Sequence, residues 1–272
     1  MPGRLFLCAT PIGNLEDASP RLARTLREAD VIYAEDTRRT AKLLAALGVT
    51  GELRSYFVGN ERRRTADIAA DLAAGRDVAL VTDAGSPAVS DPGASAVEAA
   101  RRVQAEVVVV PGPSAVVAAV MGSGMVDGRF VFEGFLERRG RDRSRQLERI
   151  ATGDAPTVLF LSPHRAAADA EALAEACGED RRVCVARELT KMHEELWWGT
   201  LGELVDKWRQ DPPRGELTLV VAEAEEPEPD LERALEIARR LVSAGEPASA
   251  AAREAAEATG VPRRQIYDRL VR

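Results

Sequence analysis

Apolar runs alternate with segments of helical period along most of the chain. A buried strand is expected at residues 4–10, and further strands are expected at residues 30–36, 52–57, 78–82 and 106–110. Helices are expected at residues 20–29, 37–47, 61–75, 92–103 and 114–122. Ser19 and Asp91 are the expected N-cap residues of the first and fourth helices. This alternation predicts right-handed βαβ units and a mainly parallel sheet.

The pattern changes near residue 130. Residues 129–136 predict an edge or crossover strand, and the arginine-rich residues 137–145 predict an exposed connection. A second α/β block follows, with strands expected at residues 157–162, 182–189, 196–200 and 216–222 and a helix at residues 164–177. No long helical pattern precedes the last two strands before residue 201. Parallel neighbours need such a crossover, so this sheet is expected to be mixed.

The end of the chain has no strand pattern. Residues 223–230 are acidic and proline-rich, which predicts a linker. Beyond them, a small-residue helix, a turn at Gly260 and a helix opened by Pro262 resemble a helix-turn-helix. Its basic side chains could contact RNA, or the tail could support packing or a dimer: Arg263, Arg264, Arg269 and Arg272. The predicted domains are 1–128, 129–225 and 226–272.

Composition narrows the possible functions. The net charge of −7 argues against a general nucleic-acid binder, although local arginine clusters keep RNA open as a partner. No apolar stretch has spanning length and the N-terminus lacks a signal-peptide layout, so a cytoplasmic protein without a membrane partner is expected. Cys8, Cys177 and Cys184 lack metal spacing and predict free thiols, and no metal site is expected.

Loops rich in glycine and proline follow three of the predicted parallel strands. They read TPIGNLED, DAGSPAVSDPG and PGPSA. In open α/β sheets, ligands bind at this edge, where glycine lets the backbone approach a ligand and proline stiffens the loop. Neither G-x-x-x-x-G-K-[ST] nor G-x-G-x-x-G is present, so a phosphate cradle is not indicated. These loops predict a small-molecule pocket.

Longer motifs carry a family resemblance. In chain order they are TPIGNLED, AEDTR, VTDAGSPAVSDPG, VPGPSA, EGFL, SPHR, ARELTK and GTLGEL. Over residues 4–222 the chain resembles the ribosomal RNA small subunit methyltransferase I family, in the tetrapyrrole methylase-like class. The resemblance implies two α/β domains with S-adenosylmethionine in the cleft between them, beside the helical tail. It also implies a homodimer that methylates a cytidine ribose 2′-hydroxyl in 16S rRNA of the small ribosomal subunit, with no DNA partner.

The resemblance also implies which residues contact the cofactor. They are Ile12, Gly85, Ser86, Val89, Ser114, Ala115, Leu161, Leu189 and Thr218. Val89, Leu161 and Leu189 could instead be ordinary core residues. The family usually has glutamate where this chain has Leu161, so any role of that carboxylate is absent or moved here.

The reaction needs a base for a weak hydroxyl nucleophile. The candidate catalytic residues are Glu35, Asp36, Glu188 and Lys191, and Glu61 is a further possibility. Lys191 would require a pKa lowered by its surroundings. Asp36 could instead cap the helix that starts at Thr37, and Glu61 could be an acid of a first helical turn.

Other polar residues beside the motifs predict contacts with the RNA substrate. They are Arg38, Asn60, Glu61, Arg165 and Arg187. Of the adjacent Trp197 and Trp198, one is expected in the core, and the other could stack on a base or line a dimer seam. Two rival functions stay open: a small-molecule, tetrapyrrole-type methylase on the same fold, and a non-catalytic helix-turn-helix binder of nucleic acid.

Overall fold

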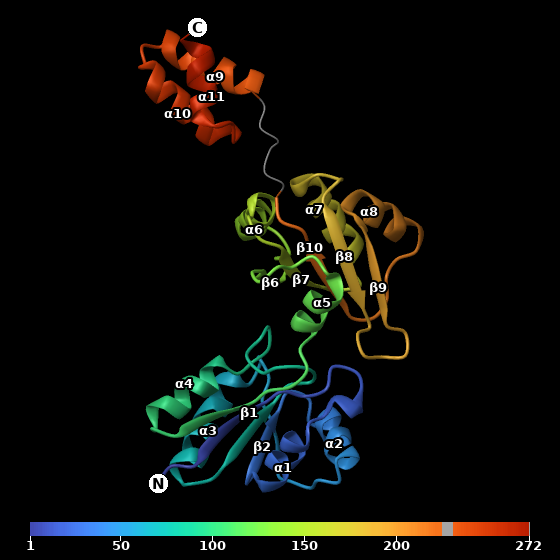
Figure 1. Cartoon of the computed structure of the whole chain (residues 1–272). Coiled ribbons are helices and arrows are strands. Elements are labelled where there is room, and N and C mark those ends of the chain that lie inside the picture. Colours follow the sequence, from blue (N-terminus) through green and yellow to red (C-terminus); the bar gives the residue numbers. More distant parts are fainter. Residues whose placement is uncertain (225–230, 272) are drawn as a thin grey trace. The chain divides into compact units, whose positions relative to one another are not determined.

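The computed structural model describes residues 1–224 and 231–271 and forms two compact units, Met1–Glu223 and Ala224–Arg272 (Figure 1). The first unit carries two β-sheets, and the described part of the second is helical. Most of the expected linker, residues 223–230, lies outside the described residues, as does a boundary at 225/226. In the described parts of the chain, no helix is long and apolar enough to cross a membrane.

The first sheet is parallel throughout, in the order β3-β2-β4-β1-β5. Its strands are β1 (Arg4–Cys8), β2 (Val31–Ala34), β3 (Leu53–Ser55), β4 (Val78–Val81) and β5 (Glu106–Val110). The helices between them are α1 (Pro20–Glu28), α2 (Thr37–Ala46), α3 (Glu61–Ala73) and α4 (Ala94–Arg102). The alternating apolar runs therefore predicted this sheet and its helices correctly.

Helices cover both faces of this parallel sheet. On one face, Leu22 and Leu26 of α1 pack with Ile32 of β2, and α2 joins them. On the other face, Ile68 of α3 and Ala100 of α4 pack on the alternate side chains of the same strands. Burial on both faces explains why these strands are almost continuously apolar. Cys8 is among the buried residues, and all three cysteines are free, as expected.

The second sheet is mixed, in the order β6-β7-β10-β8-β9. Its strands are β6 (Val131–Phe135), β7 (Thr157–Leu161), β8 (Arg182–Arg187), β9 (Glu195–Thr200) and β10 (Leu217–Val221). β6 and β7 are parallel, and the other pairs are antiparallel. The mixed character and the edge position of β6 confirm the expectations.

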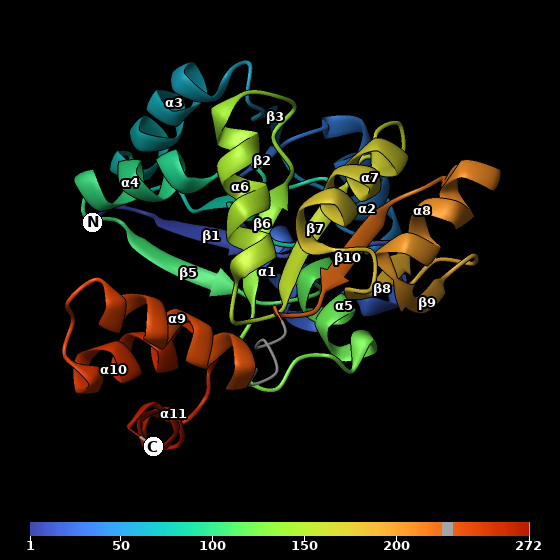
Figure 2. The same cartoon turned by 90° about the horizontal axis from the view of Figure 1, so that it is seen from above.

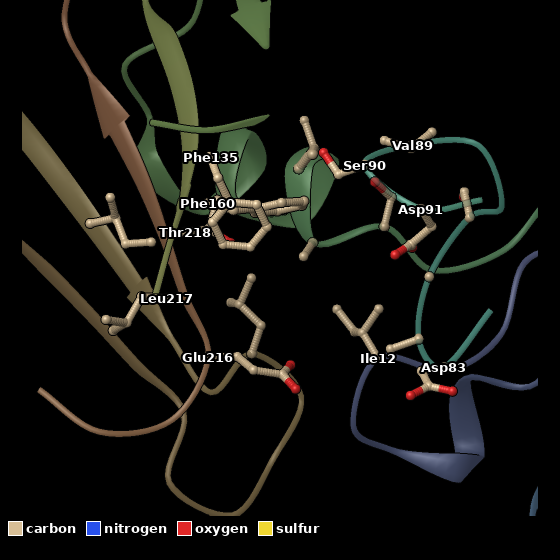
Figure 3. A pocket seen from close by; sticks show the side chains of 18 of the residues that line it. Ile12, Asp83, Val89, Ser90, Asp91, Phe135, Phe160, Glu216, Leu217 and Thr218 are labelled. Atoms are coloured by element: carbon tan, nitrogen blue, oxygen red, sulfur yellow. The ribbon is translucent and has the colours of Figure 1, made fainter. Parts of the chain in front are cut away.

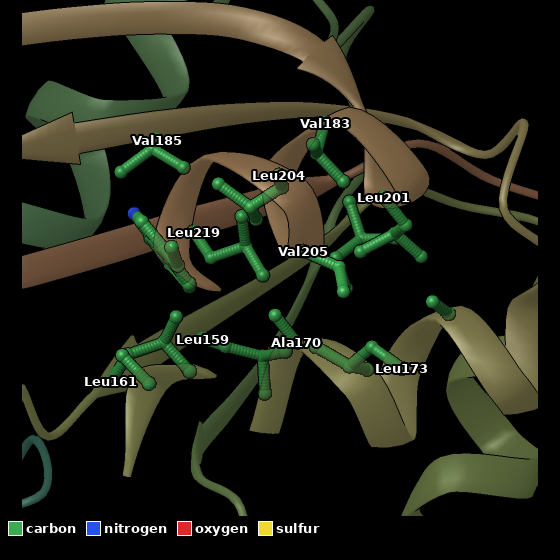
Figure 4. Close-up of a cluster of buried hydrophobic side chains, with 14 of the residues drawn as sticks. Leu159, Leu161, Ala170, Leu173, Val183, Val185, Leu201, Leu204, Val205 and Leu219 are labelled. Atoms are coloured by element: carbon green, nitrogen blue, oxygen red, sulfur yellow. The ribbon is translucent and has the colours of Figure 1, made fainter. Parts of the chain in front are cut away.

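Helices of the second block cover the two faces of this sheet. They are α5 (Ala115–Ser123), α6 (Arg141–Thr152), α7 (Ala166–Cys177) and α8 (Leu201–Gln210). Side chains of α7 and α8 close over Leu159, Leu161 and Leu219 on one face (Figure 4), and these two helices lie side by side (Figure 2). On the other face, α5 packs on Val158 and Val220.

Two helices of this block correct the sequence interpretation. Residues 141–145, expected in an exposed connection, start α6, because Gln146 and Ile150 bury one face of a helix whose other face is arginine-rich. The other helix, α8, was not predicted. It begins in a capping box, in which the Thr200 hydroxyl and Glu203 carboxylate each accept from the other residue's backbone N–H. That signal is readable in the sequence.

The second unit contains α9 (Leu231–Ser243), α10 (Ala248–Thr259) and α11 (Arg263–Leu270). Leu235, Ala252 and Ile266, one from each helix, belong to its own buried core. Gly260 adopts a left-handed conformation at the end of α10, with φ +67°, as a helix-turn-helix turn requires. The unit therefore has the local packing of an independent helical domain.

Candidate functional site

The candidate site lies at the carboxyl edge of the first sheet, beside adjacent strands β1 and β4. From β1 the chain crosses to β2 on one side, and from β4 it crosses to β5 on the other, so this is a topological switch point. A small antiparallel bridge ties the two loops together there: Thr10 N donates to Gly85 O at 2.9 Å, and Gly85 N donates to Thr10 O at 3.1 Å. The loop ends are thereby fixed before any ligand arrives.

Backbone conformations shape the loop after β4. Gly85 has φ +78°, and a Cβ there would lie 3.6 Å from Ile12 Cγ2. Ala88 and Ser90 also have left-handed φ values, +66° and +62°, and Gly93 has φ +152°. Left-handed conformations cost energy in non-glycine residues and occur most often at functional sites. The loop is therefore held in an unusual shape by its surroundings.

A cavity of about 590 Å³ opens between these loops and the second sheet. One wall consists of loops of the first sheet, including Ile12 and residues 83–86 and 89–91; the other presents Phe135, Phe160 and Leu217 (Figure 3). The volume lies within the usual range for small-molecule sites. Both sheets thus contribute to a single pocket.

All nine residues predicted to contact the cofactor line this cavity: Ile12, Gly85, Ser86, Val89, Ser114, Ala115, Leu161, Leu189 and Thr218. Leu161 also belongs to the apolar cluster under α7 and α8, with 3% exposure. Ser114 additionally caps α5 by accepting from Val117 N.

Three carboxylates on the loop wall face the same cavity: Glu35, Asp83 and Asp91. Asp83 N donates to Glu35 Oε2 at 3.4 Å, and Asp83 Oδ2 pairs with Arg39 at 3.3 Å. Burial, with the charge of Asp83, raises the pKa of Glu35. In the described parts of the chain, no group of three or more acidic, histidine or cysteine residues has a metal-binding arrangement.

Asp91 differs from the other two acids because its carboxylate has no hydrogen bond or ion pair to any residue that the structure describes. Burial, followed by the charges of Glu35 and Asp83, raises the pKa of Asp91 to about 7. Its predicted role as a helix cap is wrong: α4 starts at Ala94, with Gly93 as its N-cap residue and no side-chain cap. Gly93, with φ +152°, lies between Asp91 and the helix, and the Asp91 residue lines the cavity.

Asp36 has the structural role that the sequence left open. Its Oδ1 accepts from Arg38 N at 2.8 Å, which caps α2, and its carboxylate also pairs with the Arg38 guanidinium. These Arg38 contacts lower the pKa of Asp36 to about 2. Neither residue lines the cavity. Asp36 is therefore a poor proton acceptor, and Arg38 is an exposed partner of the cap.

Glu188 and Lys191 form an ion pair next to Glu216, a residue that lines the cavity. Lys191 Nζ lies 2.8 Å from Glu188 Oε1 and 3.2 Å from Glu216 Oε2, and neither Glu188 nor Lys191 lines the cavity. The two carboxylates outweigh burial and raise the pKa of Lys191, whereas Lys191 lowers that of Glu188. The lowered pKa that Lys191 would need as a base is thus contradicted. In the same turn, Thr190 Oγ1 accepts from Asn14 N at 3.1 Å, connecting the two sheets' loops.

The predicted substrate residues are dispersed. Asn60 and Glu61 surround the start of α3, where Asn60 Oδ1 accepts from Phe57 N and Glu61 Oε1 accepts from the Ser95 hydroxyl. Arg165 donates to Leu136 O and pairs with Asp169, beside a second cavity. Arg187 pairs with Glu195. None of these predicted residues lines the main cavity.

Sequence reasoning missed several residues of the main cavity: Arg39, Asp83, Ser90, Asp91, Phe135, Phe160 and Glu216. Asp83 and Asp91 lie inside the quoted loop motif, so their position after a buried strand was an available signal. Phe135 and Phe160 read only as apolar strand residues. One of the two tryptophans packs on the core, as expected: Trp197 packs on the apolar cluster, whereas Trp198 is 53% exposed.

Comparisons with known proteins agree with this architecture. Residues 4–205 match the family model of Tetrapyrrole (Corrin/Porphyrin) Methylases, and residues 225–272 match the RsmI C-terminal HTH domain. The chain is 42% identical to "Ribosomal RNA small subunit methyltransferase I" of Synechocystis, over 97% of this chain and 96% of that protein. It is 43% identical to the protein of that name from Thermotoga maritima, over 81% of this chain and 98% of that protein.

Solved structures share the fold at lower sequence identity. The methyltransferase CobJ matches with a TM-score of 0.64 and 20% identity, covering 82% of this chain and 95% of that chain. Uroporphyrin-III C-methyl transferase from Thermus thermophilus, complexed with S-adenyl homocysteine, matches with a TM-score of 0.59 and 21% identity, covering 82% and 98%. With its two sheets, its loop-lined cavity and its C-terminal helical domain, the chain belongs to the ribosomal RNA small subunit methyltransferase I family, S-adenosylmethionine-dependent enzymes of the tetrapyrrole methylase fold.

Proposed function

We propose that this protein transfers a methyl group from S-adenosylmethionine to the ribose 2′-hydroxyl of a cytidine in 16S rRNA of the small ribosomal subunit. The relatives' printed names support the ribosomal RNA substrate. The observation that carries the chemistry is the cavity, in which pre-shaped loops and an apolar wall enclose a carboxylate that no described side chain neutralises. The cytidine and the 2′-oxygen rest on the motif resemblance.

The cavity fits S-adenosylmethionine in size, shape and charge. Its volume of about 590 Å³ accommodates a nucleoside with an amino-acid tail. Ile12, Leu161 and Leu189 offer apolar contact, and the backbone at Gly85 and Ser86 is accessible to a ligand. The carboxylates on the loop wall favour a cationic group. We assign cofactor binding to these five residues and to Val89, Ser114, Ala115 and Thr218.

Asp91 is the proposed base. When bound, S-adenosylmethionine supplies an electrophilic methyl group on a sulfonium sulfur. The Asp91 carboxylate accepts the proton of the ribose 2′-hydroxyl, which makes the oxygen a better nucleophile. A pKa of about 7 suits a base at neutral pH. Glu35 shares the cavity, but Asp83 N already donates to its carboxylate, so we assign it a supporting charge.

The test compares the two enzyme functions directly. Purified protein is incubated with radiolabelled S-adenosylmethionine and either small ribosomal subunits from a strain lacking the gene or a porphyrinoid. We expect label in the subunits, and mass spectrometry of the nucleosides should identify 2′-O-methylcytidine and its position. Methylation of only the porphyrinoid would support the small-molecule rival. Calorimetry addresses the second rival, because a pure helix-turn-helix binder should not bind the cofactor.

The remaining proposals concern assembly and location. We propose a homodimer in the cytoplasm, where ribosomal subunits are found, and no DNA or membrane partner. In the second unit, Arg263, Arg264 and Arg269 are exposed on α11. Exposed basic groups in a chain of net charge −7 are suited to phosphate, so we assign RNA contact to this helix.

A further inference from the structure

We infer that a second cavity beside the main one is the substrate-side subsite, where a nucleobase of the RNA stacks on Phe135 while Arg138, Arg139 and Arg141 hold the flanking phosphates. This inference rests on the proposed function. It begins with a cavity of about 370 Å³ lined by Phe135, Leu136, Glu137, Arg138, Ser162 and Arg165. Phe135 and Ser162 also line the main cavity, so the two spaces adjoin.

Phe135 has the properties of a stacking platform. It is 51% exposed and lines both cavities. Its ring rests on Phe160, with centroids 5.6 Å apart, and Phe160 rests on Phe132 at 5.1 Å. This aromatic support fixes one side of Phe135 and leaves ring surface accessible. Proteins commonly bind unpaired bases on such rings.

The backbone conformation of β6 places the Phe135 ring near the loop that carries Ser90 and Asp91. The register of β6 on β7 shifts between Phe132 and Gly134, and Gly134 has φ +68°. A Cβ on Gly134 would lie 3.2 Å from Ser90 Oγ, so the irregular strand touches the residue next to Asp91. In Figure 3, Phe135 and Phe160 face Ser90 and Asp91 across the cavity. A base on Phe135 would therefore bring its ribose toward the proposed proton acceptor.

The segment after Phe135 supplies unneutralised positive charge. Residues 137–149 hold six arginines against Glu137, Asp142 and Glu148, in a chain whose net charge is −7. Arg143 pairs with Asp169 and Arg149 with Glu133, so these two support the fold. Arg138, Arg139 and Arg141 are exposed and form no ion pair with any of the described residues. Guanidinium groups beside an exposed aromatic ring match a nucleotide and its phosphates.

The first test replaces Phe135 with leucine, which keeps apolar contact with Phe160 but removes the stacking surface. The probe is a fragment of small-subunit rRNA containing the nucleotide mapped by the methylation experiment. We expect Phe135→Leu to weaken RNA binding about tenfold to a hundredfold, with cofactor affinity within twofold of wild type. Phe57→Leu is the matched control, because Phe57 is 44% exposed and lines neither cavity. It should bind RNA like wild type.

The second test measures RNA affinity across a salt series. Arg138→Ala combined with Arg139→Ala should reduce the slope of log affinity against log salt by about 0.7 for each phosphate that is no longer neutralised. The control double variant, Arg24→Ala with Arg27→Ala, removes two arginines from α1, far along the chain from this segment, and should leave the slope unchanged.

The outcomes separate this subsite from the proposed function. Wild-type protein that neither binds nor methylates the RNA would contradict the function itself. A methylating wild type with an equally tight Phe135→Leu variant would overturn the stacking assignment. An equal loss of cofactor and RNA affinity in Phe135→Leu would make Phe135 part of the cofactor wall, and an unchanged salt slope would remove the phosphate contacts.

Discussion

The two walls of the main cavity are built in different ways. The first sheet contributes loops, with left-handed backbone at Gly85 and Ser90 and carboxylates at Asp83 and Asp91. The second sheet contributes apolar side chains held by strands, such as Phe160 and Leu217. The acidic loop residues and the left-handed backbone thus come from the first sheet, and the aromatic side chains come from the second.

This difference shows how an ordinary carboxyl group acquires an unusual acidity. Asp91 lies on the polar wall, but burial is the largest cause of its raised pKa, and the charges of Glu35 and Asp83 add to it. Apolar residues of both sheets line the same cavity, among them Ile12 on the loop wall and Phe160 on the opposite wall. An aspartate on the isolated loop would have an ordinary pKa. The proposed base therefore depends on both sheets.

The largest effect is expected from disrupting the loop wall. Ser86→Arg fills the cavity and places a second cation where a sulfonium must bind, so S-adenosylmethionine binding should be abolished. Calorimetry measures this, with circular dichroism to establish folding. The control Ser249→Arg changes an exposed serine in α10 and should bind the cofactor normally. Unchanged affinity in folded Ser86→Arg protein would remove this loop from the site.

The next largest effect concerns the proposed base. Asp91→Asn should lower turnover about 10²- to 10⁴-fold while the cofactor still binds, and Asp127→Asn, a change outside the cavity, should have no effect. Because the carboxylate form is the active one, the wild-type rate should rise with pH up to about 7 and then level off. A wild-type rate in Asp91→Asn would exclude Asp91 as the base.

Asp91 also has a stability signature with a definite sign. Its folded pKa of about 7 lies above the value of about 3.9 expected in the unfolded chain. The folded protein therefore holds the proton more tightly, and its stability should fall as pH rises between these values. Asp91→Asn removes this fall, so its melting temperature should exceed that of wild type at pH 8 but not at pH 4. Equal melting temperatures at pH 8 would contradict a half-buried, unpaired carboxylate with a raised pKa.

A smaller effect is expected from removing the second unit. Truncation after Glu226 should leave a folded, dimeric core with cofactor affinity within a few-fold, because the first unit contains both sheets and the complete cavity. RNA affinity should decrease and its salt slope should flatten, because the exposed arginines of α11 are removed. Identical slopes would mean that the tail is structural.

The smallest effect is expected at the Glu188–Lys191 ion pair, which does not line the cavity. Lys191→Ala removes the partner of Glu188 and Glu216. Because this partly exposed ion pair is worth about 1 kcal/mol or less, the melting temperature should fall by about 2–4 °C at most. Turnover at saturating cofactor should stay within threefold of wild type. A hundredfold loss of turnover with unchanged melting would return Lys191 to the catalytic group.

Local patterns determined much of the fold. Burial on both faces makes a central parallel strand continuously apolar, so β4 was predictable without neighbours. The apolar run of β5 predicted a strand as well, although β5 lies at the sheet edge and Val109 is 60% exposed. Ser19 and Ser114 cap their helices, because a cap bonds within three residues of itself. The cofactor loops were also predictable from local sequence, because each follows a parallel strand and such strands end at a common edge. That geometry accounts for six of the nine predicted cofactor residues, Ile12, Gly85, Ser86, Val89, Ser114 and Ala115, whereas Leu161, Leu189 and Thr218 reach the same cavity from the second sheet and its loops.

Only the tertiary structure decided which acidic groups face the cavity. In the sequence, Asp36 and Asp91 both follow strands and precede helices. In the structure, Arg38 binds the first, whereas Gly93 turns the second away from its helix toward two other acids. Lys191 is similar, since its charge is stabilised by Glu216, which is distant in sequence. Protonation depends on burial and on charges within a few ångströms, and those neighbours come together only when the chain folds.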